Sequence, residues 1–135
     1  MKKNQIGLRK TKQRELILEI ISSAQGPVSV NEITLLLEQR DQSIGIATIY
    51  RTVNLLLDNK LINCIRLQDA VQRYEPTDIP HHHHFYCNDC NKVFDLVGCY
   101  LKMDGPTTSE GHLVSSHEIT FRGTCKKCQT CDHCQ

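Results

Sequence analysis

The chain has 135 residues, of which 39% are hydrophobic, 5% aromatic and 23% charged, and its net charge is +1 at pH 7. This length suits one ordinary domain or two small ones. No apolar run approaches the length of a membrane span, and the basic N-terminus lacks the apolar stretch of a secretory signal. We therefore expect a cytoplasmic protein without a membrane partner.

The charge is divided unevenly along the chain. Residues 1–75 carry eleven Lys and Arg against eight Asp and Glu, whereas residues 76–135 carry five against seven. The first fourteen residues contain six basic side chains and no acidic one. A basic first half and a second half rich in cysteine and histidine indicate two modules with different partners.

Three helices are predicted in the first half. The stretch "KQRELILEIISS" has apolar residues at helical spacing, and Thr11 is placed to cap it. Ser29 and Glu32 form the pattern of a capping box before "ITLLLEQR". The stretch "GIATIYRTVNLLLDNK" predicts a third helix that ends near Asn59 and Lys60.

The third helix is followed by two short β-rich runs, "LINCIRL" and "VQRYE", which predict a hairpin. Three helices and a hairpin are the outline of a winged helix-turn-helix. A helical wheel puts apolar residues on one side of the third helix and the polar residues on the other, namely Thr48, Arg51, Thr52, Asp58 and Asn59. A polar outer face with Arg and Thr suits a helix docked in a DNA major groove, although it is also what a plain solvated face looks like.

The second half begins after a hinge. The stretch "PTDIP", residues 76–80, has two prolines that fit neither a helix nor a central strand. We therefore expect a winged-helix domain over 1–75, a second domain over 81–128 and a tail over 129–135. Three strands are predicted in "HHHHFYC", "NKVFDLV" and "HEITFRGTC", which makes the fold class α+β.

Two Cys-x-x-Cys pairs carry the strongest chemical signal. Cys87 and Cys90 are followed, after thirty-four residues, by Cys125 and Cys128. Four thiolates match the tetrahedral ligand set of a closed structural Zn2+ site. A redox dithiol is the alternative, but neither pair has the βαβ surroundings typical of one.

Four consecutive histidines precede the first pair. Side chains alternate between the two faces of a strand, so His82 and His84 are expected on one face. Glu75 before the hinge and Asp95 on the neighbouring strand can complete a site of imidazoles and carboxylates there. Such a site suits Fe2+, Mn2+ or Zn2+.

The opposite face of that strand carries the other two histidines. His81 and His83 are expected there, and His117 on the last strand can join them in a second site. The alternative is that some of these histidines only line an exposed edge of the sheet.

Four stretches together resemble the ferric uptake regulator family of bacterial metal-sensing repressors. They are "LRKTKQRELILEII", "GIATIYRTVNLLLDNKLI", "HHHHFYCNDCNKVFD" and "HEITFRGTCKKC". The resemblance implies a homodimer whose protomers join a winged-helix domain to a small α/β dimerisation domain. It also implies a structural zinc on the four cysteines, a regulatory metal on Glu75, His82, His84 and Asp95, a further site on His81, His83 and His117, and DNA contacts from Tyr50 and Arg51.

Some positions depart from the pattern of that family. The histidine that members usually place before the second helix is Pro27 here, and an acid of the second site is Lys102. Cys64 is a candidate to replace the missing ligand, but it is equally read as a buried apolar residue. The interruption at Gly105-Pro106 indicates a shortened helix in the dimerisation domain.

These observations favour a repressor that binds an operator in double-stranded DNA when a metal is bound. Lys10 and Arg14 in the basic arm are expected to contact phosphates. Zinc-uptake or peroxide-sensing regulation is the alternative within the family, and the resemblance associates Asp95, in place of Glu, with peroxide-sensing members. A thiol oxidoreductase and a metal-storage module are the alternatives outside it.

No H-E-x-x-H pairing supports a zinc hydrolase, so no enzyme is expected. Cys99, Cys131 and Cys134 receive no assigned role.

Overall fold

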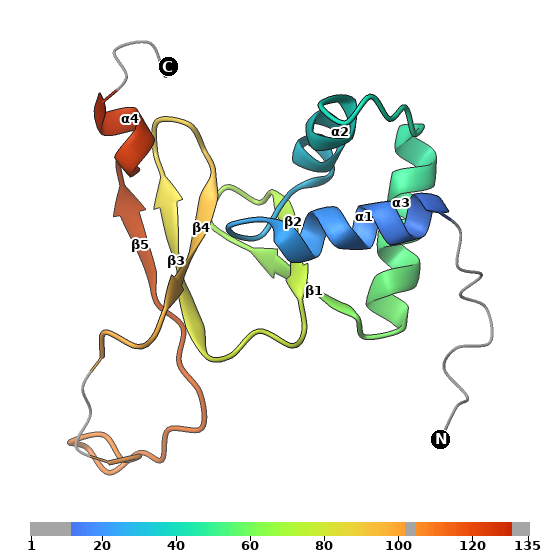
Figure 1. The fold of residues 1–135 in the computed structure, drawn as a ribbon. Coiled ribbons are helices and arrows are strands. Elements are labelled where there is room, and N and C mark those ends of the chain that lie inside the picture. Colours follow the sequence, from blue (N-terminus) through green and yellow to red (C-terminus); the bar gives the residue numbers. More distant parts are fainter. Residues whose placement is uncertain (1–11, 102–104, 131–135) are drawn as a thin grey trace. The chain divides into compact units, whose positions relative to one another are not determined.

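A computed structural model describes residues 12–101 and 105–130 of the chain. These residues form two compact units, the first ending at Ile79 and the second beginning at Pro80. The elements of each unit can be followed along the ribbon in Figure 1. Thr11, the expected cap of the first helix, lies outside the described residues, as do Lys10, Lys102, Cys131 and Cys134.

The first unit contains three helices followed by a hairpin, in the predicted order (Figure 1). The elements are α1 (Lys12–Ser23), α2 (Val30–Glu38), α3 (Ile46–Asp58), β1 (Ile62–Arg66) and β2 (Gln72–Pro76). β1 and β2 pair antiparallel, from Ile62 opposite Pro76 to Arg66 opposite Gln72. Pro76, which the sequence placed in the hinge, is thus the last residue of β2. Proline is tolerated there because it ends the strand and so interrupts no further pairing.

One apolar core holds these elements together. Its buried side chains come from all three helices, from the loop before α2 and from both strands: Ile17, Ile20, Ile21, Val28, Val30, Ile33, Leu37, Ile49, Val53, Leu56, Ile62 and Tyr74. Tyr74 and Val28 also exchange backbone hydrogen bonds of 2.8 and 3.0 Å, which tie the hairpin to the start of α2. Burying each such aliphatic side chain contributes about 1.5–3 kcal/mol, so the first unit has a sufficient core of its own.

A capping box begins α2, as the sequence predicts. The Glu32 amide donates to Ser29 Oγ at 3.2 Å, and the Ser29 amide donates to the Glu32 carboxylate at 3.3 Å. Two amides at the helix start, which have no partner within the helix, are satisfied in this way.

Replacing Ser29 by Ala is expected to lower the free energy of unfolding of the first unit by about 1 kcal/mol, because one of these amides loses its acceptor. Urea unfolding followed by circular dichroism measures the change. Ser43→Ala, at an exposed loop position, is the matched control and should change it by less than about 0.5 kcal/mol. Equal stabilities for the two variants would contradict a stabilising capping box.

The polar face of α3 differs from the expected one at Thr52. The sequence put Thr52 on the outer face, but its side chain is only 4% exposed. Thr52 lies three residues after the buried Ile49, and residues three apart share a helix face, so the placement on the wheel was wrong. Asn59, also placed outward, caps the helix by donating from its side chain to Leu55 O at 2.8 Å.

The second unit is a three-stranded sheet with a short helix (Figure 1). Its elements are β3 (His82–Cys87), β4 (Val93–Val97), β5 (Thr120–Gly123) and α4 (Lys126–Thr130). β3 is central, antiparallel to β4 and parallel to β5. The described part of the connection between β4 and β5 contains no helix, so the expected helix is absent there rather than merely shortened. The predicted tail begins at 129, within α4.

Few apolar side chains are buried in the second unit. Among its described residues, 80–101 and 105–130, the buried ones are Tyr86, Cys87, Val93, Cys125 and His83. Such a small set gives little hydrophobic stabilisation, and two of the five are cysteines that the sequence assigns to a metal. No helix in the described parts of the chain is long and apolar enough to cross a membrane.

Candidate metal centres and DNA-facing helix

The four cysteines of the two Cys-x-x-Cys pairs lie together at one end of the sheet. The sulfur atoms of Cys87, Cys90, Cys125 and Cys128 all lie within 4.8 Å of one another. The Cys90 and Cys125 sulfurs are 3.9 Å apart. A tetrahedral zinc with Zn–S bonds of about 2.3 Å separates its sulfurs by about 3.8 Å, so this cluster fits Zn2+.

Backbone turns position these sulfurs. Cys87 ends β3, and a tight turn returns the chain through Asn91, whose φ is 59° and whose amide donates to Cys87 O at 2.9 Å. Tyr86 Oη donates to the Asn91 side chain at 3.0 Å, which supports that left-handed residue. Cys125 directly precedes α4, so one helical turn brings Cys128 back to the same place.

The protonation of the cluster also favours a cation. Burial raises the pKa of Cys87, but the backbone amides of Cys125, Cys90 and Asp89 outweigh it and lower that pKa to about 6. Burial raises the pKa of Cys90, and burial with the neighbouring thiols raises that of Cys128. Four thiolates this close together repel one another, and a divalent metal would remove that repulsion by binding all four.

His82 and His84 lie on one face of β3, opposite β4. His84 is directly paired with Asp95 across the strands. The Nε2 atoms of His84 and His82 lie 3.5 and 3.7 Å from the same Asp95 oxygen, and the two rings are 4.9 Å apart. The three side chains thus present two imidazole nitrogens and a carboxylate around one point, which is a ligand set for Fe2+, Mn2+ or Zn2+.

Glu75, the fourth residue predicted for that site, belongs to the first unit. It lies on β2 opposite Asn63, whereas Cys64 lies opposite Tyr74. Adjacent residues of a strand point to opposite faces, so Cys64 faces away from Glu75 and cannot share a metal with it. The reading of Cys64 as a buried apolar residue is also wrong, because its side chain is exposed. Pro27, where the family pattern has histidine, is fully buried.

His81, His83 and His117 come together on the other face of β3. The Nε2 atoms of His81 and His117 are 3.2 Å apart, and the ring of His83 lies 4.7 and 5.1 Å from theirs. The sequence placed His117 on the last strand, but it precedes β5 by three residues. It reaches the cluster because the Ile119 amide, at the entry to β5, donates to His83 Nδ1 at 3.3 Å.

Cys99 is a fourth member of this cluster that the sequence did not single out. Its sulfur lies 3.1 Å from His117 Nε2 and 3.3 Å from His83 Nε2. The residue follows Gly98, whose φ of 90° turns the chain at the end of β4. A glycine directly after a predicted strand was the available signal, but it does not say where the next side chain goes.

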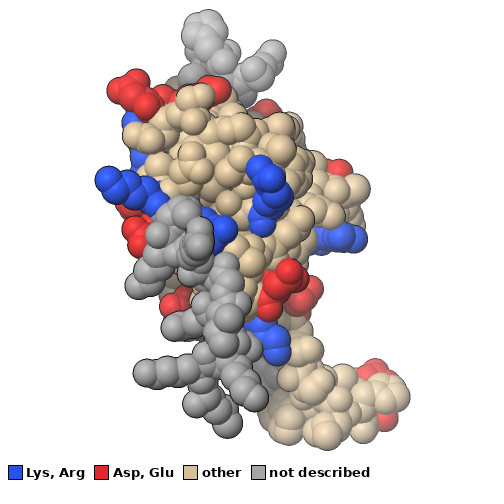
Figure 2. Space-filling model, turned by 90° about the vertical axis from the view of Figure 1, so that its right-hand side faces the viewer, with Lys and Arg blue, Asp and Glu red and all other residues tan. Residues whose placement is uncertain are grey.

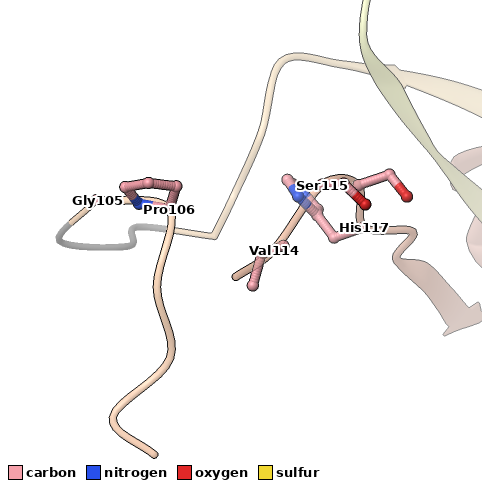
Figure 3. A pocket seen from close by; sticks show the side chains of 6 residues that line it. Gly105, Pro106, Val114, Ser115 and His117 are labelled. Carbon is pink, nitrogen blue, oxygen red and sulfur yellow. The ribbon is translucent and has the colours of Figure 1, made fainter. Parts of the chain in front are cut away.

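The connection that carries Cys99 and His117 also forms a small pocket. Gly105 and Pro106 face the segment Val114–His117 across it, as Figure 3 shows. The Val114 amide donates to Pro106 O at 2.7 Å and closes this loop. The loop therefore has its own backbone support for the position of His117.

The outer face of α3 presents the residues predicted to contact DNA. Tyr50 and Arg51 are exposed, Thr48 is half-buried, and Arg51 donates to Thr48 Oγ1 at 3.2 Å. Arg14 is half-buried on α1. Figure 2 shows Lys and Arg side chains as separate groups on the viewed face, with acidic groups between them. On the face shown in Figure 2, charge alone therefore does not mark a DNA-binding surface.

A family model described as the ferric uptake regulator family matches residues 5–122. The chain belongs to the ferric uptake regulator family. Among curated relatives, the ferric uptake regulation protein of Campylobacter upsaliensis is 29% identical over 126 residues, covering 90% of this chain and 81% of the relative. The peroxide-responsive repressor PerR of Staphylococcus aureus is 27% identical and covers 93% of this chain and 85% of its own. A solved structure of a zinc-bound manganese uptake regulator superposes with a TM-score of 0.73 at 25% identity, covering 88% of this chain and 92% of that one.

These comparisons confirm the predicted family and the α+β fold class. Ferric uptake regulator proteins are transcriptional regulators rather than enzymes, so the chain is a metal-responsive transcriptional regulator. Proteins of this family bind DNA and are dimeric. The relatives are named for iron, manganese and peroxide, so they do not select one signal for this chain.

Proposed function

We propose that this chain is a homodimeric repressor that binds its DNA operator when Fe2+, or another divalent metal, occupies the site of His82, His84 and Asp95. The observation that carries the proposal is the approach of two imidazole nitrogens to one carboxylate oxygen, at 3.5 and 3.7 Å. Such a mixed nitrogen and oxygen set binds divalent metals reversibly enough to act as a sensor.

Glu75 is proposed as the ligand that couples this site to the DNA-binding half. It lies at the end of β2, only seven residues before His82, so the connecting chain is short enough for both to reach one ion. A metal held by residues on both sides of the segment 76–80 would favour one arrangement of the two halves. We propose that the domains are 1–75 and 81–128, with 76–80 as the hinge and 129–135 as the tail. Metal and DNA then strengthen each other's binding by the same factor.

The thiolate cluster has a different role in this proposal. Zinc on Cys87, Cys90, Cys125 and Cys128 would be structural, since four protein ligands leave no open position. His81, His83 and His117 on the opposite face of β3 are proposed as a second, separate metal site. Residues of β3 would thus take part in three metal sites.

A second copy of the chain is the proposed partner for the exposed sheet edge. β5 lies at one edge of the described sheet, and Phe121 on it is 41% exposed and meets the Tyr100 ring edge to face. Val97 and Leu113 are 89% and 79% exposed in the same unit. An open edge strand with exposed apolar side chains favours association, which agrees with the dimeric state of the family.

The three helices and the hairpin of the first unit are proposed to act as a winged helix-turn-helix with α3 in the major groove. Thr48, Tyr50 and Arg51 would contact DNA from its outer face. Lys10 in the basic N-terminal stretch and Arg14 on α1 would contact phosphates. A dimer would present two copies of α3 to successive major grooves. The protein would act in the cytoplasm, where its operator lies.

Arg51→Ala is expected to weaken metal-dependent DNA binding by about 1–3 kcal/mol, or roughly 5- to 150-fold in Kd, if Arg51 reads a base edge. Fluorescence anisotropy with an operator selected from a random DNA pool measures the change. Arg40→Ala is the matched control, because Arg40 is exposed, lies outside α3 and is paired with Glu19 of α1 at 3.2 Å. An unchanged Kd for Arg51→Ala would remove α3 from the interface.

The function itself is tested by measuring metal content and DNA selection together. Protein purified without oxygen should hold one tight zinc per protomer, and Fe2+, Mn2+ or Zn2+ should be needed to enrich one DNA sequence from the pool. If only zinc led to enrichment of a DNA sequence, the zinc-uptake alternative would be selected. If the iron-bound protein enriched a sequence and lost this ability on peroxide treatment, the peroxide-sensing alternative would be selected. Turnover of a disulfide substrate, or bulk metal loading without any enriched sequence, would overturn regulation in favour of an oxidoreductase or a storage protein.

A further inference from the structure

We propose that Cys99 is a metal ligand, and that with His81 and His117 it makes the second site a thiolate-containing site. This inference rests on the proposed second site and adds a ligand of a different chemical class. Cys99 Sγ lies 3.1 Å from His117 Nε2, which in turn lies 3.2 Å from His81 Nε2. Three donor atoms from three separate segments thus meet around one point.

The distances between these nitrogen and sulfur atoms match those between the ligand atoms of a tetrahedral metal ion. With Zn–N bonds of about 2.05 Å and a Zn–S bond of about 2.3 Å, nitrogens lie about 3.3 Å apart and a nitrogen lies about 3.5 Å from the sulfur. The distances of 3.2 and 3.1 Å are within a few tenths of an ångström of these values. The sulfur also lies 3.3 Å from His83 Nε2 and 3.5 Å from Leu101 O, both farther than His117 Nε2.

His83 has a different role, which its backbone contact defines. The Ile119 amide donates to His83 Nδ1, so a neutral ring carries its proton on Nε2. That proton points to Cys99 Sγ at 3.3 Å. His83 is also buried, with 1% of its surface exposed, so this tautomer is held in place. It therefore serves as a positioning residue that donates to the sulfur and stabilises the thiolate, as an outer-shell partner does in other metal sites.

The thiolate determines which metals the site prefers. Thiolate and imidazole together favour Zn2+ and the similar Co2+, whereas carboxylate and water favour Mn2+. The site around His82 and His84 contains a carboxylate and no sulfur. The two faces of β3 therefore differ in metal class, with the softer metal on the Cys99 face.

Cobalt is the probe that tests this assignment, because a bound thiolate gives Co2+ a near-ultraviolet charge-transfer band that imidazole and carboxylate do not. The full-length protein carrying His82→Ala and His84→Ala, prepared with one zinc per protomer on the four cysteines, is titrated with Co2+ without oxygen. We expect a charge-transfer band that saturates near one Co2+ per protomer while the zinc content stays constant. Cys99→Ser in the same background should abolish the band and weaken Co2+ binding roughly 100-fold or more, since even outer-shell changes cost about 10–100-fold.

Cys64→Ser is the matched control and should leave both the band and the affinity unchanged. A band that persists in Cys99→Ser at constant zinc content would overturn the proposal. His83→Gln, which can still donate to the sulfur, should keep the band and lose less affinity than His117→Ala. Equal loss of Co2+ binding in those two variants would make His83 a ligand and overturn its role as a donor. DNA binding is not the readout, so these outcomes are independent of whether the chain proves to be a repressor.

Discussion

Replacing Cys90 by Ser is expected to release the tightly bound zinc and to unfold the second unit while the first stays folded. The described part of the second unit buries only Tyr86, Cys87, Val93, Cys125 and His83, so it lacks an apolar core like that of the first. Structural zinc contributes about 10–16 kcal/mol of apparent binding free energy at pH 7 in small zinc-binding peptides. Losing one of four ligands therefore removes more stability than a unit of this size has.

Elemental analysis and amide-resolved NMR spectra measure this effect. The variant should be made with Cys131→Ser and Cys134→Ser, so that neither tail thiol can replace the missing one. Cys64→Ser in the same background is the control, because Cys64 is exposed on β1 and belongs to no cluster of ligands among the described residues. A Cys90→Ser protein that keeps its zinc and the dispersed signals of the β3 sheet would show that the metal is not what holds the second unit together.

The double substitution His82→Ala and His84→Ala is expected to abolish the metal dependence of DNA binding. Both imidazoles would be lost from the site that Asp95 completes, and one carboxylate in water binds divalent metals weakly. Coupling between two ligands is typically about 1–3 kcal/mol, so the 5- to 150-fold gain in operator affinity on adding metal should fall to none. Residual DNA binding by α3 without metal should remain.

Anisotropy titrations with and without Fe2+ or Mn2+ measure that gain, and elemental analysis should find the thiolate zinc still present. His112→Ala is the matched control, because His112 is exposed in the loop before β5 and its hydrogen bonds are made by its backbone. If the double variant responded to metal as strongly as the control, the regulatory site would have to lie elsewhere.

Local patterns predicted the first unit well because each of its elements is decided by neighbours in the sequence. The Ser29 and Glu32 pair, the end of α3 at Asn59 and the hairpin all follow from residues a few positions apart. Alternation along β3 likewise predicted which histidines share a face. The prediction that Thr52 lies on the outer face of α3 was wrong only because its angle on the helical wheel was misjudged.

The second metal cluster was only partly predictable because its members come from irregular chain. Cys99 and His117 are eighteen residues apart, and neither lies in a helix or strand that would give its direction. Their meeting depends on the turn at Gly98 and on the Ile119 amide, which are tertiary features. Conversely, Cys64 could replace the missing metal ligand only if it shared a face with Glu75. The register of the hairpin places these two residues on opposite faces.

The central strand of the second unit limits how the gene for this protein can change in length. β3 carries His82 and His84 on one face, His83 on the other and Cys87 at its end. Inserting or deleting one codon between 81 and 87 would move every preceding histidine to the opposite face relative to the cysteine. Single substitutions would each affect one candidate site, whereas such a one-residue change in length would put the histidine sites and the cysteine site out of register with each other. This seven-residue segment is therefore expected to tolerate no variation in length.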